Sequence, residues 1–188
     1  MLVFRMSLAV LFSMSSLILA DPGMQITTIE KQLTLQAADT MAQAAIAAAE
    51  KGHFFVSVVV ADATGRALVQ KTMPGAGVLA PHLARAKANA VISFGTSTRA
   101  IQGRYADSPG GIASIAAIGA AGSVPISAEW GGVVLRDPEN HIVAAIAVAG
   151  AGLAVEDEHC AIAGATAIGS LKAEPAESSI SLPQKDEP

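Results

Sequence analysis

The sequence predicts an α+β domain in which helices pack on one antiparallel sheet. Two pairs of apolar, β-branched segments, within residues 54–72 and 131–150, are each joined by a short polar turn, which is typical of β-hairpins. Segments with helical periodicity stand before, between and after these pairs. The resulting order of helix, hairpin, helix, hairpin and helix favours a single layer of strands covered by helices.

The first helix is expected from Thr34 to Lys51. Thr34 suits the N-cap position, and Gly52 follows the last turn as a stop signal. Polar side chains fall on one face of this helix, and alanines fall on the opposite face. The apolar run at 54–61 then predicts a central strand, and the alternating segment 66–72 predicts its antiparallel partner.

A second helix is expected after the glycine-rich segment MPGAG at 73–77. Pro81 is well placed in its first turn, where a missing N–H costs little. The next region, 96–128, is less regular. We expect a short helix at 98–104, a loop at 108–111 and one or two short strands.

The second hairpin is expected to pair 131–136 with 141–150. The return segment lacks alternation, which indicates a strand buried on both faces. A last helix is predicted from Asp157, as its N-cap, to Lys172. The Pro-, Ser- and Glu-rich residues 173–188 have the composition of a disordered tail.

The first 20 residues are typical of a secretory signal peptide. Arg5 precedes a short apolar run, and the small residue Ala20 precedes Asp21 and Pro22. An uncleaved anchor helix is the alternative, although the run is shorter than the roughly 20 apolar residues of a comfortable membrane span. We therefore expect a periplasmic or secreted protein whose single domain covers residues 24–172.

Composition limits the classes of function. The formal net charge of −4 argues against a nucleic-acid partner, because such partners are usually met by a basic patch. Cys160 is the single cysteine, so the domain cannot form an internal disulfide. Neither a P-loop nor a dinucleotide fingerprint is visible, and no nucleophile–base pair stands out, so no catalytic residue is assigned.

Two strings of residues resemble the GlcG/HbpS family. The segment from Met73 to Phe94, with Gly75-Ala76 and Ala84-x-Ala86-Lys87-Ala88, is similar to the family pattern R-M-D-G-A…A-x-A-K-A…F. The second hairpin, followed by Glu156-Asp157-Glu158, resembles the family's G-G-V-P-L…G-x-I-G-V-S-G…D-E ending. The resemblance covers about residues 28–171 and departs from the pattern at Pro74, Ala80, Ala147 and Ala149.

This resemblance implies a fold and a ligand. The family fold is profilin-like, with an antiparallel sheet of about five strands flanked by helices, and its members usually assemble into oligomers. Members bind haem or iron, and some are described as haem-degrading. We therefore expect a homo-oligomer that binds a small ligand, with haem as the favoured cofactor and no turnover. Haem degradation or another small-molecule conversion, and a purely structural role, are the alternatives.

Lys87 is the candidate that the helical periodicity singles out. On the helical wheel it falls inside the apolar stripe, where a charge is costly unless it is paired or reaches an opening. Its stem could pack while its ammonium reaches the edge. Alternatively, the ammonium lies at the floor of a pocket beneath the segment 73–77 and binds a carboxylate, such as a haem propionate.

His82 and Met73 are the candidate axial ligands of a haem iron. The wheel places His82 on the polar face, so it is either a solvated histidine or a ligand where this face meets haem or a second subunit. Met73 could instead pack against the core. Gly75 would shape the approach to the pocket, and Arg85 would contribute to ligand binding or remain solvated.

The segment EDEHC at 156–160 resembles a metal cluster but is not expected to bind a metal. Adjacent residues on a helix point in different directions, so they do not converge on one ion. His141, which directly follows a turn, is expected to be exposed.

Overall fold

The structure is a computed structural model that describes residues 31–106 and 110–174, which belong to one compact unit beginning at Lys31. Within these residues, no helix is long and apolar enough to cross a membrane. The predicted signal peptide at 1–20 and most of the predicted tail lie outside the described residues. Both stay predictions.

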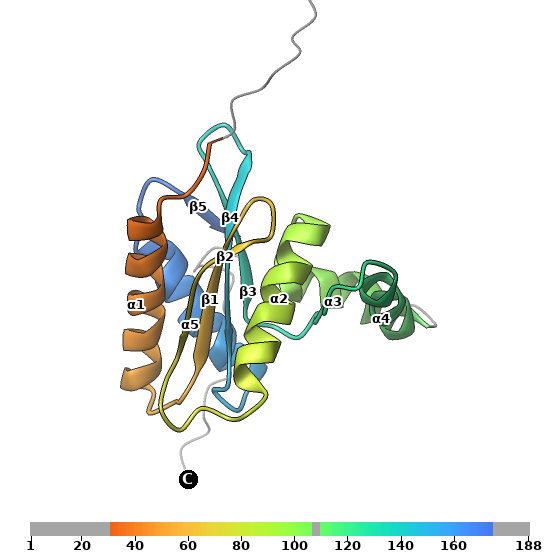
Figure 1. Ribbon diagram of the computed structural model, residues 1–188, viewed down its shortest axis with the longest axis horizontal. Helices are drawn as coiled ribbons and strands as arrows, with labels where there is room; N and C mark the ends of the chain where they lie inside the picture. Colours follow the sequence, from red (N-terminus) through yellow and green to blue (C-terminus); the bar gives the residue numbers. More distant parts are fainter. Residues whose placement is uncertain (1–30, 107–109, 175–188) are drawn as a thin grey trace, which may run out of the picture. The chain divides into compact units, whose positions relative to one another are not determined.

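Five antiparallel strands form one sheet in the order β2-β1-β4-β3-β5 (Figure 1). Their bounds are Ser57–Asp62 for β1, Ala67–Thr72 for β2, Gly132–Arg136 for β3, Ile142–Ala149 for β4 and Lys172–Glu174 for β5. The two predicted hairpins are β1–β2 and β3–β4, and β4 joins them by pairing with β1. The predicted α+β class and the five-stranded sheet are confirmed.

Helices cover both faces of this sheet (Figure 1). One face carries α1 (Leu35–Lys51) and α5 (Ala154–Thr166), and the other carries α2 (Ala80–Phe94). Two further helices, α3 (Thr98–Ala106) and α4 (Gly111–Ala121), lie beyond α2.

Successive side chains of β1 point to opposite faces of the sheet, and because helices cover both faces, all of them are buried. Val58 and Val60 pack in the cluster formed with α1 and α5, whereas Val59 packs toward α2. On that side, Ala84 and Ala88 of α2 meet alanines of β4. Small side chains let the helix approach the sheet closely, which keeps this layer dense without aromatic residues.

Local signals located the first elements correctly. The Thr34 hydroxyl accepts a hydrogen bond from the backbone N–H of Ala37 at 3.2 Å, and Gly52 ends α1. Pro81 lies in the first turn of α2, and a short helix begins at Thr98 as expected.

Three expectations were wrong. Residues 111–121 form helix α4, and no strand is found among the described residues of 96–128. Helix α5 begins at Ala154 and ends at Thr166, with Leu153 rather than Asp157 as its N-cap. Residues 173–174 belong to β5 and not to a disordered tail, because β5 pairs with β3.

Candidate functional site

The Lys87 side chain is completely buried. Its ammonium donates hydrogen bonds to Asp157 Oδ2 at 2.8 Å and to the backbone oxygen of Val148 at 3.2 Å. A carboxylate oxygen of Glu129, a half-exposed residue, lies 3.4 Å away. The predicted place of Lys87 in the apolar stripe is thus confirmed, and its charge is balanced by a buried acid instead of reaching the edge.

Gly131 provides the space for this ion pair. Its φ is +117°, and a Cβ atom there would lie 2.6 Å from the Val148 oxygen and 2.8 Å from Asp157 Cβ. Asp157 also accepts the backbone N–H of Ala151 at 2.9 Å. Burial raises the pKa of Asp157, although the Lys87 ammonium opposes this shift. The first glycine of the Gly-Gly pair is therefore required by packing around a buried charge.

A second ion pair lies beside the first. Arg99 Nη2 donates to Glu158 Oε2, and the guanidinium carbon lies 4.1 Å from the centre of the Trp130 ring. Glu158 is completely buried, and its Oε1 has no hydrogen-bond partner among the described residues. Burial raises the pKa of Glu158, against the effect of Arg99.

The segment 156–160 thus distributes its side chains over different partners. Asp157 binds Lys87 of α2, and Glu158 binds Arg99 of α3. Cys160 is buried, and burial raises the pKa of its thiol to about 12, so the thiol stays protonated at neutral pH. His159 is exposed.

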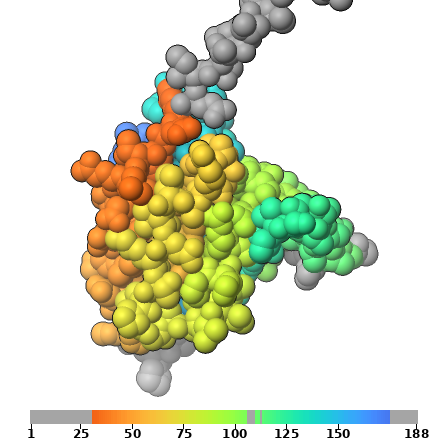
Figure 2. All heavy atoms as spheres, viewed as in Figure 1, coloured from red at the N-terminus to blue at the C-terminus, as the bar shows by residue number. Residues whose placement is uncertain are grey.

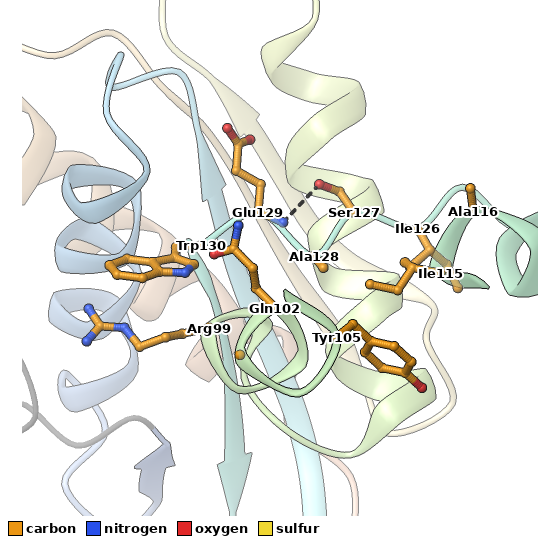
Figure 3. Close-up of a pocket in the computed structure, with 11 residues that line it drawn as sticks. Arg99, Gln102, Tyr105, Ile115, Ala116, Ile126, Ser127, Ala128, Glu129 and Trp130 are labelled. Atoms are coloured by element: carbon orange, nitrogen blue, oxygen red, sulfur yellow. Dashed lines mark hydrogen bonds between the residues drawn. The ribbon is translucent and has the colours of Figure 1, made fainter. Parts of the chain in front are cut away.

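A pocket of about 670 Å³ lies between α3, α4 and the segment 126–130 that precedes β3 (Figure 3). Its lining is mainly apolar, with a few polar groups from α3 and from the segment 126–130. The described lining residues are Arg99, Gln102, Gly103, Tyr105, Ile115, Ala116, Ile126, Ser127, Ala128, Glu129 and Trp130. Arg99 and Trp130 stack at one end, whereas Tyr105 lies at the other with its hydroxyl pointing away from Trp130.

The pocket and the buried charges share residues. Glu129 lines the pocket and approaches Lys87, and Arg99 lines it while pairing with Glu158. No role for this region is predicted from the sequence. A signal was available, because the only tryptophan and the only tyrosine of the chain, Trp130 and Tyr105, both line the pocket.

The structure does not bring the predicted ligand-binding residues together. Met73 follows β2 and packs against the cluster formed with α1 and α5. The ammonium of Lys87 lies at β4, which is separated from β2 by β1. Lys87 is therefore not at the floor of a pocket beneath 73–77, and this expected placement is corrected.

His82 is exposed near the start of α2, and Gly75 has a φ of +92° and is exposed. Their binding roles stay predictions.

Two polar residues of α2, Arg85 and Asn89, are covered by other parts of the chain. Arg85 is half-buried, and its Nη2 donates to the backbone oxygen of Gly65 at 2.9 Å. Asn89 is buried and donates to the backbone oxygen of Pro125 at 3.0 Å. The segment after α4 folds back over this part of α2, which the wheel of a single helix cannot show. His141 is exposed, as expected.

The chain is similar to known proteins in sequence and in fold. The model of a family described as "Haem degrading protein HbpS-like" matches residues 33–166. A crystal structure of a double mutant of HbpS from Streptomyces reticuli is 34% identical, covering 76% of this chain and 91% of that chain with a TM-score of 0.65. No protein with a curated description matches.

Two more distant structures show the fold alone. The Klebsiella pneumoniae protein ORFY is 22% identical, covering 79% of this chain and 99% of that chain with a TM-score of 0.69. A PduOC structure in complex with haem is 19% identical, covering 73% of this chain and 96% of that chain with a TM-score of 0.61. Because the family model covers most of the described residues, the chain belongs to the HbpS-like family of haem degrading proteins.

Proposed function

We propose that the protein binds haem and that the pocket between α3, α4 and residues 126–130 receives the porphyrin. The observation that supports this most is the pocket itself. Sites for flat cofactors are concave, mainly apolar and about 300–1,000 Å³ in volume, with a few polar groups that set the orientation. The pocket has about 670 Å³ and this kind of lining, in a chain of a haem-degrading family.

The lining residues suit the two parts of a haem. Ile115, Ile126 and the ring of Tyr105 offer apolar contact to the porphyrin. Arg99 lies at the opposite end, beside Trp130, where its guanidinium, which also pairs with Glu158, would meet a propionate. Bound haem would supply an iron centre for oxygen chemistry, and the protein would bind, orient and shield it.

The axial ligand distinguishes this pocket from the site predicted around 73–82. Among the described lining residues, none is a histidine, cysteine or methionine, so the pocket offers oxygen donors only. His82 and Met73 would serve a haem bound at the other end of α2, or one held by a second copy. Ligation of the haem iron by histidine or methionine differs from ligation by oxygen, so experiment can distinguish the two candidate sites.

Haem titration followed by Soret absorbance tests the proposal. Ala116→Trp fills the pocket and should weaken haem binding by about tenfold or more, equivalent to ~1.4 kcal/mol. Ala120→Trp, on the same helix but outside the described lining, is the matched control and should bind as the unchanged protein does.

The other possible outcomes of this titration show where the haem binds. A shifted Soret band in His82→Ala or Met73→Leu, with Ala116→Trp unaffected, would place the haem at the 73–82 end instead. No spectral change with the unchanged protein would refute haem binding altogether.

Haem degradation is the second candidate function, because the matching family is described by that activity. It predicts that the Soret band of the bound haem is lost with a reductant and oxygen, and that iron is released in proportion. A band that persists under these conditions would indicate binding without turnover.

A further inference from the structure

The two edges of the sheet differ in how well they are protected from pairing with another strand. Strands β2 and β5 form these edges, because the strand order is β2-β1-β4-β3-β5. Strand β5 has three residues, and its two charged residues, Lys172 and Glu174, are both exposed. A short and charged edge strand is a poor template for a further strand. Strand β2 has six residues, and Lys71 is the only charged one among them.

Strand β2 lacks most of the features that keep an edge from pairing. It contains no proline, and Lys71 is neutralised by a 2.7 Å ion pair with Asp39 of α1. The register shift at Val60 and Ala61 of β1 lies near the β1–β2 turn, so residues 69–72 are paired regularly. Figure 2 shows this part of the chain, in yellow, at the surface between α1 in orange and α2 in green. Such an edge is suited to bind another strand.

The ladder with β1 shows which backbone groups of β2 point outward. The Met73 N–H donates to the Val56 oxygen at 2.9 Å. In an antiparallel pair, residues that bond to the neighbouring strand alternate with residues whose N–H and C=O groups point away from it. Lys71 therefore faces β1, whereas the backbone groups of Gln70 and Thr72 face the outer edge. There they pair with no strand of the described part of the chain.

We propose that the β2 edges of two copies of this chain pair antiparallel about a two-fold axis, so that their sheets become one continuous sheet. A register centred on Gln70 brings the outward-facing groups of the two strands together, with Gln70 opposite Gln70 of the partner subunit. Lys71 then lies opposite Val69 of the partner subunit, so like charges do not meet across the pair. A register centred on Lys71 would instead bring two ammonium groups together.

The self-complementarity of this edge favours a second copy over a different partner. An isologous interface requires one surface that fits itself, and β2 meets this condition in the register centred on Gln70. The two-fold axis is perpendicular to the sheet, so each of α1 and α2 would lie beside the same helix of the other copy. These helices would extend the contact toward the area that a stable interface needs. The contact is independent of haem binding, and other surfaces can join such pairs into larger closed assemblies.

The outward-facing N–H of Gln70 provides the test. Gln70→Pro removes this N–H but keeps the ladder with β1, as is tolerated on edge strands. It should therefore halve the mass of the full chain measured by size-exclusion chromatography with light scattering. Gln70→Ala keeps the N–H and is the matched control, and its mass should equal that of the unchanged protein.

Charges at the same position test the symmetry, and they keep the proposal testable if Gln70→Pro does not fold. Gln70→Glu and Gln70→Lys should each weaken pairing by about tenfold or more, because like charges meet at the axis. An equimolar mixture of these two variants should restore the original mass, because opposite charges then meet. A monomeric unchanged protein, folded Gln70→Pro and charged variants that assemble as the unchanged protein does, or a mixture that stays dissociated would overturn the proposal.

Discussion

Lys87 and Arg85 stand two residues apart on α2 and point in different directions, as such a spacing requires. Lys87 reaches past Gly131 to Asp157 of α5, whereas Arg85 reaches the β1–β2 turn at Gly65. From the sequence, an anion-binding role is one of two interpretations of Lys87, and Arg85 either contributes to ligand binding or remains solvated. The structure balances the charge of Lys87 internally, whereas Arg85 Nη1 has no hydrogen-bond partner among the described residues.

The Lys87–Asp157 pair yields a prediction for stability. Lys87→Met should lower the free energy of unfolding by about 3–5 kcal/mol, because it leaves the Asp157 carboxylate buried without its cation. Urea unfolding followed by circular dichroism measures this loss. Lys71→Met is the control, since Lys71 forms a 2.7 Å pair with the more exposed Asp39, and it should cost much less.

A double variant separates the charge from the packing. Lys87→Met combined with Asp157→Leu should be less destabilised than Lys87→Met alone, because neither charge remains buried without a partner. Equal losses for Lys87→Met and Lys71→Met would contradict the importance of the buried pair.

At the scale of elements, the β3–β4 turn is organised by Asp137. Its buried carboxylate accepts the backbone N–H of His141 at 2.8 Å and the Lys31 ammonium at 3.0 Å. Burial alone would raise the pKa of Asp137, but these hydrogen bonds together hold it well below its usual value. The turn is therefore stabilised by an ionised carboxylate.

The depressed pKa of Asp137 predicts how stability depends on pH. The stabilisation is present above the unfolded-state pKa of about 3.9 and is lost as the pH falls toward the folded-state value. Asp137→Asn should therefore lower the melting temperature at pH 7, and the difference from the unchanged protein should shrink progressively below about pH 4. Melting curves between pH 7 and pH 2 measure it, and a difference independent of pH would contradict this account.

Two elements show why part of the fold could not be predicted from the sequence. Helix α4, GIASIAAIGAA, contains alanine, glycine, isoleucine and a single serine without charged residues, so no polar face marks it as a helix. Strand β5 has three residues, two of them exposed, and it exists because it pairs with β3. By contrast, α1 has a cap and a polar face within its own sequence, and it was located to within one residue.

At the scale of the whole described unit, exposed apolar side chains gather at the end where β1 begins. We call these the end patch: Phe55, Val78, Leu79, Leu83 and Leu153. The ring of Phe55 lies against Gly75, and Gly150, three residues before Leu153, approaches Phe55 and Ala80. Figure 2 shows the segment around residue 75, in yellow, at this lower end. Clustered apolar exposure is typical of an interaction surface.

The end patch is the surface that we expect to support the predicted homo-oligomer. Val78 is 88% exposed and Leu79 is 66% exposed. Converting both to aspartate should lower the mass measured by size-exclusion chromatography with light scattering, because like charges would then meet across the interface. Leu35→Asp is the control, since Leu35 is 62% exposed but lies at the start of α1. An unchanged mass in the double variant would exclude the patch as the assembly surface.

Caps, turns and periodicity are local properties, so the sequence alone carries the fold class, both hairpins, the helices that begin near Thr34 and Ala80, and the burial of Lys87. The partners of these residues depend on topology. Asp157 is 70 residues from Lys87, and the walls of the Trp130 pocket come from two helices and a separate segment. The strand order and the helix packing decide which distant residues come together. No local sequence pattern specifies that arrangement. For this reason only the tertiary structure reveals the Trp130 pocket, while the ligand roles of the segment 73–82 and of Arg85 stay predictions.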